Sequence, residues 1–384
     1  MEFIAKQSSL LRELNLVQGA VERKHTIPIL ANVLLQTAND SVTVMATDLD
    51  MSVRSSLTAG VTREGALTVS ARKFHEIVRA LPDSEVHFKA DGENWATITC
   101  ERAHFRIMGL PKDDFPTLPM PRAGKKITFG IQQFREMVQK VIFAVTQDDG
   151  RFALNGALLF LSKGAINLVA SDGHRLAFVS HPHAGGSESD LRVVIPQKAL
   201  SELSRIGEEI GGEILFSKEE NQIFFEMGRC VLASKLLEGN FPNFEKVIPT
   251  ANDKVIVLDR TGFADAVKRV SLVANDRNRG IKLAVSNGKL ELSAKNPELG
   301  EARETLVVDY KADEIEIGFN ARYILDFLSV VDSATITLEL KDESAQGMLR
   351  PVHPGDVAPG KGKTAKAAEA ATLDYKYVIM PMRV

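Results

Sequence analysis

Cysteine is scarce in this chain, which has two, Cys100 and Cys230, among 384 residues. Two thiols in separate strand-like stretches exclude a disulfide framework and a CxxC metal site, and they predict reduced side chains in a core. The first residues, MEFIAKQSSLLREL, carry Glu2 and Lys6 and lack a long apolar stretch ahead of a cleavage site. We therefore expect no signal peptide, no membrane span and a cytoplasmic protein.

Motifs for chemistry are also missing. Ser171, Asp172 and His174 offer the atoms of a hydrolase triad, but neighbours in sequence rarely form one, because its members normally come from separate segments. There is no GxSxG turn and no GxxxxGK[ST] phosphate loop. His181 and His183 lack a second Cys or His cluster that would complete a metal site. We expect no enzyme, and neither catalytic residues, cofactor nor metal.

The chain instead contains an internal repeat with a period of about 125 residues. Its first sign is an apolar face spaced by four, three and four residues, which is typical of an amphipathic helix. This face occurs as Leu10, Leu14, Val17, Val21, as Phe134, Val138, Val141, Val145, and as Phe263, Val267, Val270, Ala274. Strand-like stretches follow each helix, and a further strand leads into a second helix in every copy.

The stretch SDGHRLAF, residues 171–178, stands in the middle copy where the first has TDLDM and the third AKNPE. Asp48, Asp172 and Asn296 thus share one turn-forming position. SDGHR is predicted to be a hairpin-like turn, with His and Arg added in the middle copy alone. We expect three domains, 1–125, 126–252 and 253–384, divided by stretches rich in Pro, Gly and Asn at 109–126 and 238–254.

Neither sign of charge dominates, since the net charge is -3 and the pI is near 6.3. Averaged over the surface, this excludes a simple basic nucleic-acid binder. The average hides a segregation of charge, because the predicted helices together are net positive and the rest of the chain is net negative. The helical windows are 8–24, 71–82, 130–141, 197–207, 260–270 and 319–328. Helices that faced one way could hold duplex DNA loosely without reading its sequence. Alternatively, their Lys and Arg serve solubility.

Several stretches together resemble one family. They are the three tandem copies, IPIL after the first helix, TDLDM, LNG, DGHRLA, FPNFEKVIP, GFNARYILD and the terminal YVIMPMR. In this order, from the first residue to the last, the chain closely resembles the bacterial beta sliding clamps, processivity subunits of the replicative DNA polymerase. The resemblance implies an α+β fold, the DNA clamp fold, in which each copy is a domain with two inner helices and two outer antiparallel sheets. It also implies a head-to-tail ring dimer around duplex DNA.

The resemblance implies partners as well. They are double-stranded DNA bound without sequence preference, the replicative polymerase, an ATP-dependent clamp loader, and repair polymerases or other proteins that carry a clamp-binding motif. Such proteins would insert a short peptide into a pocket formed here by Leu154, Ser171, Gly173, His174, Arg175, Leu176, Pro242, Lys246, Val247, Val378, Ile379, Met380, Pro381, Met382 and Arg383. Met, Leu, Ile and Pro suit an adaptable apolar site. Without the resemblance, the terminal VIMPM run is typical of an ordinary edge strand.

Positions for DNA and for a second copy carry over in the same way. The DNA-binding set is Arg23, Lys24, Gln147, Lys198, Asn320 and Tyr323. Two residues depart from those of some clamps: Asp148 stands where they have a glutamine, in the loop before LNG, and Asn278 where they have an aromatic residue, near the end of the third copy's first helix. For the contact between chains, Phe105 and Ile107 would meet Leu272 and Val273, while Arg72 and Lys73 would face Glu298 and Glu301.

One segment and one alternative remain. Residues 351–375, PVHPGDVAPGKGKTAKAAEAATLDY, are rich in Pro, Gly, Ala and Lys, which predicts a mobile loop with no assigned role. A monomeric scaffold that binds peptides but no DNA would share the tail pocket and lack ring closure. The mass of the protein in solution distinguishes this alternative from a ring.

Overall fold

The computed structural model describes residues 1–21, 27–124, 126–146, 148, 150, 152–162, 164–183, 191–275, 278–352 and 373–383. The chain divides into two compact units. Unit 1 comprises Met1–Arg135 and Lys198–Leu236, and unit 2 comprises Glu136–Gln197 and Leu237–Val384. Among the helices of the described residues, none has the length and apolar character that a membrane crossing requires.

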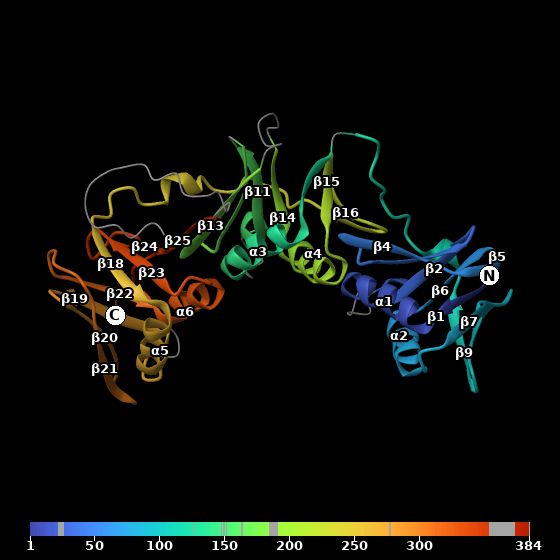
Figure 1. Cartoon of the computed structure of the whole chain (residues 1–384), viewed down its shortest axis with the longest axis horizontal. Helices are drawn as coiled ribbons and strands as arrows, with labels where there is room; N and C mark the ends of the chain where they lie inside the picture. The colour runs from blue at the N-terminus through green and yellow to red at the C-terminus, as the bar shows by residue number, and fades with distance from the viewer. Residues whose placement is uncertain are drawn as a thin grey trace. The chain divides into compact units, whose positions relative to one another are not determined.

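One order of elements occurs three times, with an additional strand, β5, in the first copy (Figure 1). The first copy contains β1 (Glu2–Lys6), α1 (Gln7–Val17), β2 (Asn32–Ala38), β3 (Ser41–Thr47), β4 (Met51–Thr58), β5 (Gly60–Arg63), β6 (Gly65–Ser70), α2 (Ala71–Ala80), β7 (Glu85–Ala90), β8 (Trp95–Cys100) and β9 (Ala103–Leu110). The second contains β10 (Ile127–Gly130), α3 (Ile131–Val141), β11 (Gly156–Ser162), β12 (Ala165–Ser171), β13 (Arg175–Pro182), β14 (Arg192–Pro196), α4 (Gln197–Ile210), β15 (Glu213–Glu219), β16 (Gln222–Met227) and β17 (Cys230–Lys235). The third contains β18 (Lys254–Asp259), α5 (Arg260–Ser271), β19 (Gly280–Ser286), β20 (Lys289–Asn296), β21 (Gly300–Val307), β22 (Ile315–Asn320), α6 (Ala321–Val330), β23 (Thr335–Leu340), β24 (Gly347–Pro351) and β25 (Asp374–Ile379). The predicted α+β class with three tandem copies is confirmed.

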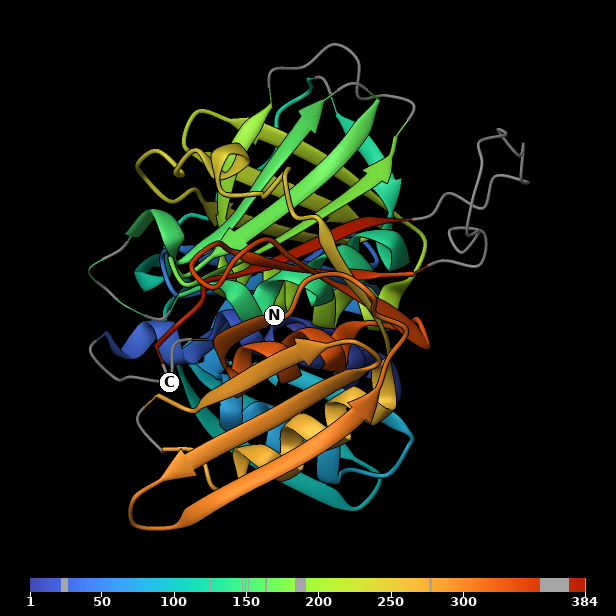
Figure 2. The same cartoon turned by 90° about the vertical axis from the view of Figure 1, so that its left-hand side faces the viewer.

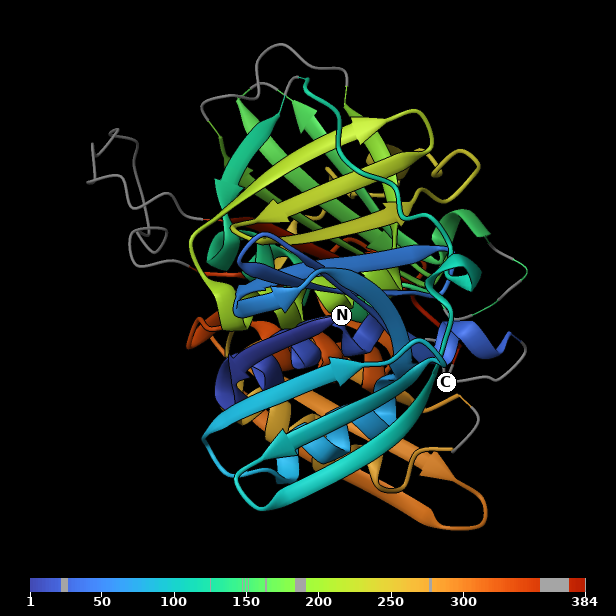
Figure 3. The same ribbon diagram turned by 90° about the vertical axis from the view of Figure 1, so that its right-hand side faces the viewer.

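Antiparallel pairing joins the strands within each unit. In the described residues, unit 1 holds a 13-stranded sheet in the order β10-β15-β16-β17-β4-β3-β2-β6-β9-β8-β7-β1-β5. Unit 2 holds an 8-stranded sheet, β14-β11-β12-β13-β25-β24-β23-β18, and a 4-stranded sheet, β21-β20-β19-β22. The orange strands β19, β20 and β21 lie in front of α5 in Figure 2, and the cyan strands β7, β8 and β9 lie side by side in Figure 3.

The helices bury the apolar faces that their spacing predicts. Every residue of the three predicted faces is buried except Val21, which is half-buried at the end of the first helical segment. The two thiols are buried as well. Burial raises the pKa of the Cys230 thiol to about 12, so that this side chain stays protonated and unreactive at neutral pH.

Strand pairing also links one copy to the next. In unit 1, β4 of the first copy pairs with β17, the last strand of the second copy, from Arg54 opposite Val231 to Met51 opposite Ser234. In unit 2, β13 of the second copy pairs in the same way with β25, the last strand of the third copy. We call these two pairings the inner junctions.

The first inner junction contains a buried carboxylate. Glu13 of α1 is 8% exposed and accepts a hydrogen bond from the hydroxyl of Ser55 in β4. Burial raises the pKa of Glu13 above its usual value of 4.5, although the hydrogen bond from Ser55 opposes this shift. The charged form of Glu13 therefore opposes folding at neutral pH.

Glu13→Gln should raise the thermal midpoint at neutral pH, because the amide still accepts from Ser55 and carries no charge. The folded state holds the Glu13 proton more tightly than the unfolded state. The stability of the wild type relative to the variant is therefore greatest below the usual pKa of a glutamate. It decreases as the pH rises through the raised pKa of Glu13. Scanning calorimetry from pH 4 to pH 8 measures this difference. Glu93→Gln changes an exposed glutamate and is the matched control; parallel pH profiles for wild type and Glu13→Gln would contradict the assignment.

Candidate functional site

The stretch SDGHR folds into a tight turn held by its own side chains. The Oδ1 atom of Asp172 accepts from the backbone N–H of His174 at 2.9 Å and of Arg175 at 3.0 Å. The hydroxyl of Ser171 donates to the carbonyl of Arg175 at 2.8 Å and accepts from the N–H of Gly173 at 3.2 Å. Gly173 has a φ of 88°, a left-handed conformation that glycine adopts without strain.

The first copy builds the same turn with other residues. Asp48 accepts from the N–H groups of Asp50 at 3.0 Å and Met51 at 2.7 Å, and Thr47 makes both hydroxyl contacts of Ser171. Leu49 holds the left-handed position with a φ of 79°. In the third copy Asn296 accepts from the N–H of Glu298 at 2.9 Å. The predicted equivalence of Asp48, Asp172 and Asn296 is confirmed.

In unit 2 this turn borders a cavity of about 120 Å³. The cavity lies where the chain after β17 packs on the faces of β12 and β13 beside the end of β25, and its surface is almost wholly apolar. Its lining comprises Leu154, Ser171, Gly173, Arg175, Leu176, Phe241, Pro242, Phe244, Val247, Val378 and Met380. Such a site takes an apolar side chain and offers few polar groups to orient it.

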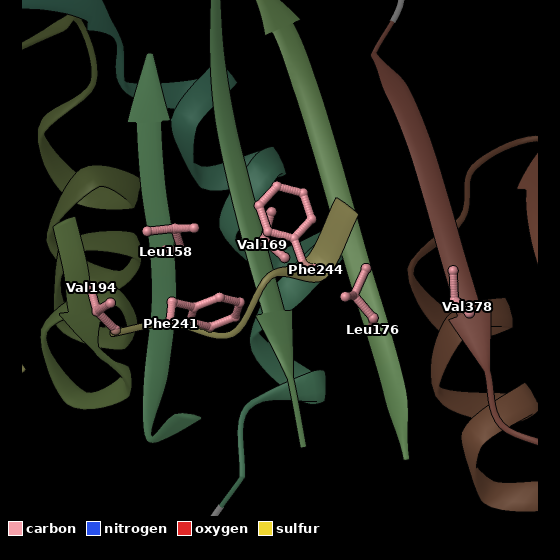
Figure 4. Packing of buried hydrophobic residues seen from close by; sticks show 7 residues of the cluster. All are labelled: Leu158, Val169, Leu176, Val194, Phe241, Phe244 and Val378. Carbon is pink, nitrogen blue, oxygen red and sulfur yellow. The ribbon is translucent and has the colours of Figure 1, made fainter. Parts of the chain in front are cut away.

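A cluster of buried apolar residues underlies the cavity and lines it through Leu176, Phe241, Phe244 and Val378 (Figure 4). Phe241 and Phe244 come from the segment after β17 and lie over the strands that carry Leu158, Val169 and Leu176. The ring of Phe244 lies 5.6 Å from that of Phe160 and 6.1 Å from that of Phe178. These contacts fix the segment on the sheet, so the cavity is preformed.

The structure gathers most of the residues predicted for the pocket. Those that line the cavity are Leu154, Ser171, Gly173, Arg175, Leu176, Pro242, Val247, Val378 and Met380. Those that do not line it are His174, Lys246, Ile379, Pro381, Met382 and Arg383. Ile379 is fully buried next to Val378 in β25, and its side chain points to the other face of the strand, so its role in the pocket stays a prediction.

Sequence reasoning missed Phe241 and Phe244. Both lie in the FPNF stretch with Pro242, in a segment whose Pro, Gly and Asn content indicates a domain boundary. An aromatic pair spaced by three residues in such a segment was an available signal, because exposed linkers rarely carry large apolar side chains.

Arg175 lies at the cavity edge but points its guanidinium into unit 2. Nε donates to Asp172 at 3.0 Å, Nη1 to Asp326 of α6 at 2.5 Å, and Nη2 to the carbonyl of Phe143 at 2.5 Å. The guanidinium carbon lies 4.4 Å from the ring centre of Tyr323 and 5.3 Å from that of Phe143. Burial alone lowers the pKa of Arg175, but Tyr377, Asp326 and Asp172 raise it, so the group stays charged.

The described residues of the predicted DNA set make local contacts. Lys198 of α4 forms an ion pair with Asp48 of the first turn. Asn320 caps α6 by accepting from the N–H of Arg322 at 2.9 Å, and Tyr323 stacks on Arg175. Arg23, Lys24 and Gln147 lie outside the described residues. So does most of the segment 351–375.

The two residues that depart from the family pattern are described. Asp148 is exposed and accepts from the N–H of Gly150 at 3.0 Å. Asn278 accepts from the N–H of Gly280 at 3.2 Å, at the entry to β19. Both side chains therefore stabilise the backbone of their own loops.

The residues predicted for the contact between chains lie on the surface of their units. Phe105 and Ile107 of β9 and Val273 after α5 are half-buried, and Leu272 is 80% exposed. Glu298 and Glu301 are exposed. Arg72 and Lys73 bind Glu76 at 2.9 and 2.8 Å, and their hydrogen bonds, that of Lys73 first, lower the pKa of Glu76 to about 2.

Metal chemistry has no site in the part of the chain that the structure describes, since no three His, Cys, Asp or Glu side chains gather to hold an ion there. His181 and His183, the pair noted in the sequence, are not joined by other ligands in that part.

Comparisons with known proteins agree along the whole chain. Models of the DNA polymerase III beta subunit match with its N-terminal domain at residues 1–119, its central domain at 129–243 and its C-terminal domain at 245–359. The chain is 33% identical to the beta sliding clamp of Pseudomonas putida KT2440 and 34% identical to that of Pseudomonas aeruginosa PAO1, over 100% of both chains in each comparison.

Solved structures give the same result. The DnaN sliding clamp of Bartonella birtlesii bound to griselimycin matches with a TM-score of 0.90 at 35% identity, and that of Pseudomonas aeruginosa bound to griselimycin with a TM-score of 0.91 at 33% identity. Both matches cover 100% of each chain. The chain therefore belongs to the DNA polymerase III beta subunit family, the beta sliding clamps, which are DNA-replication processivity factors with no catalysis of their own.

Proposed function

We propose that two copies of this chain close head to tail into a ring that encircles duplex DNA, and that the cavity beside SDGHR tethers the replicative polymerase to it. A partner ATPase, the clamp loader, opens the ring and places it on DNA, since the chain has no phosphate loop. Repair polymerases and other proteins with a clamp-binding motif use the same cavity. The three domains of each chain comprise residues 1–125, 126–252 and 253–384. The ring acts in the cytoplasm, at the nucleoid.

The observation that carries the ring is a pairing left open by the repeat. The strand after the turn is β4, β13 or β21, and the last strand of a copy is β9, β17 or β25. The inner junctions pair β4 with β17 and β13 with β25. Among the described residues β21 pairs with β20 alone, and Ala103–Met108 of β9 pair with β8 alone. In a dimer, β9 of one chain would pair with β21 of the other, as β17 pairs with β4 and β25 with β13 within the chain.

Exposed apolar side chains support this closure. Val307 of β21 is 93% exposed, Leu272 after α5 is 80% exposed and Leu299 in the third turn is 62% exposed. An uncovered strand edge with such neighbours invites association. Phe105 and Ile107 follow Ala103 in β9 by the same steps as Leu232 and Ser234 follow Cys230 in β17, and both residues of β17 are buried at the inner junction.

Charges at the open ends agree with the same arrangement. At the first inner junction Lys198, at the start of α4, binds Asp48 of the turn. Arg72 and Lys73 begin α2, while Glu298 and Glu301 border the equivalent turn of the third copy. Closure would place these two cations beside these two carboxylates, which favours the head-to-tail orientation over its alternatives.

The DNA contacts proposed for the ring divide into two groups. Arg23, Lys24 and Gln147 are proposed from the family resemblance alone. Lys198, Asn320 and Tyr323 also make contacts within the units, so any DNA role of theirs competes with Asp48, the cap of α6 and Arg175. Weak, sequence-independent contacts suffice when enclosure retains the DNA.

Retention on closed circular DNA tests the ring. After loading by a bacterial clamp loader with ATP, the protein should co-elute with a circular plasmid in gel filtration and leave it once the plasmid is cut. Retention on linear DNA would contradict enclosure. Ile107→Asp should elute as a 42.1 kDa monomer and fail to stay on the circle, because a charge cannot be buried at the closing junction. Leu215→Asp alters an exposed apolar residue of β15 and should leave retention unchanged.

Gly173→Leu tests the cavity. The equivalent turn holds Leu49 at a φ of 79°, so the variant should fold with a loss of about 1–2 kcal/mol in the free energy of unfolding. The new side chain enters the cavity and should abolish binding of griselimycin, the ligand of the Bartonella and Pseudomonas clamps, while ring retention persists. Isothermal titration calorimetry measures the binding. Leu49→Gly is the control and should bind normally; undiminished binding by Gly173→Leu would refute the pocket.

A further inference from the structure

Arg175 connects three elements that are far apart in the sequence. Its guanidinium donates to Asp172 in the turn, to Asp326 in α6 and to the carbonyl of Phe143 in the short helix η4 (Ile142–Ala144). The rings of Phe143 and Tyr323 lie within cation–π distance of the guanidinium carbon. Arg175 is 8% exposed, so these groups nearly exclude water from it.

The turn itself does not need this arginine. In the first copy Met51 occupies the equivalent position, and Asp48 forms the same backbone hydrogen bonds without a cation from its own strand. The ion pair of Asp48 comes from Lys198 of α4. The contacts of Arg175 therefore do something in the second junction beyond shaping the turn.

Those contacts join the two walls of the cavity. One wall is the turn and β13, with Ser171, Gly173 and Leu176. The other wall is the end of β25, with Val378 and Met380, where the N–H of Met380 donates to the carbonyl of His174 at 2.9 Å. In β25 the hydroxyl of Tyr377 donates to the carbonyl of Tyr323 in α6 at 2.9 Å. Arg175 therefore binds α6 through Asp326, and α6 binds β25 through the hydrogen bond of Tyr377.

We propose that Arg175 is a positioning residue of the pocket, which fixes β25 against the SDGHR turn through Asp326, and that it does not bind charge on the docked segment. This inference rests on the proposed tethering function of the cavity. Each guanidinium nitrogen of Arg175 donates to an acceptor on a different element. This arrangement explains why a planar guanidinium stands there, since the single amine of a lysine does not present donors in three such fixed directions.

Griselimycin binding by calorimetry separates positioning from direct contact. Arg175→Met copies the first repeat and should weaken binding by about tenfold, the scale of a coupled polar contact. Asp326→Asn should also weaken it, although Asp326 does not line the cavity, and the double variant should be no weaker than Arg175→Met. Normal affinity in Asp326→Asn would overturn the inference. That result is expected if Arg175 contacts the ligand directly, because such a contact does not need Asp326. Asp309→Asn, at an exposed carboxylate of unit 2, is the matched control.

Hydrogen exchange keeps the two proposals distinguishable. If wild type fails to bind griselimycin, the tethering role of the cavity fails. The positioning role is then judged by the amide of Met380, whose bond to His174 closes the wall. Arg175→Met and Asp326→Asn should each speed its exchange several-fold, whereas the amide of Val179, inside the paired strand, should keep its rate. Unchanged exchange at Met380 in both variants would overturn the inference.

Discussion

Antiparallel pairing between one copy and the next is the constraint on which this molecule depends. In each copy one strand follows the turn: β4, β13 or β21. One edge of this strand pairs with the preceding strand, and the backbone groups of its other edge also need partners. At the inner junctions the last strand of the following copy fills that place. The pairing buries Leu232 and Tyr377, which are fully enclosed although they belong to terminal strands. A chain of three copies necessarily leaves one such strand and one such partner unmatched.

The same constraint explains how a protein with little net charge stays on DNA, a polyanion. A net charge of -3 would be a poor basis for holding DNA by attraction. Several cations of the helices are already used inside the chain, as Lys198 on Asp48 and Arg205 on the carbonyls of Asn15 and Leu16 illustrate. Under the proposed closure, retention depends on the strand pairings that complete the ring, and the basic groups need to contact the DNA only weakly.

Local patterns revealed the repeat, whereas contacts between distant segments did not appear in the sequence. The apolar spacing of Leu10, Leu14 and Val17 is a property of one helix, and the turn of Asp172 closes on its own neighbours, so both were predictable. The resemblance predicts Arg175 in the pocket, but its partners Phe143 and Asp326 lie far away along the chain, and no local rule brings them together. The same segment contributes Pro242 and Val247 by resemblance, but its Pro, Gly and Asn content indicates a boundary and gives no sign that Phe241 and Phe244 pack on the sheet.

The cavity follows from how one turn diverged between copies. In the first copy Leu49 occupies the left-handed position, and β17, whose Lys235 donates its N–H to the carbonyl of Asp50, continues into the next segment of chain. In the second copy Gly173 leaves that position without a side chain, and β25, which makes the matching bond from Met380 to His174, ends in a short tail. With no side chain at this position, Gly173 lines the cavity together with Leu154, Pro242 and Met380. The proposed peptide site therefore lies beside the turn whose left-handed position is a glycine.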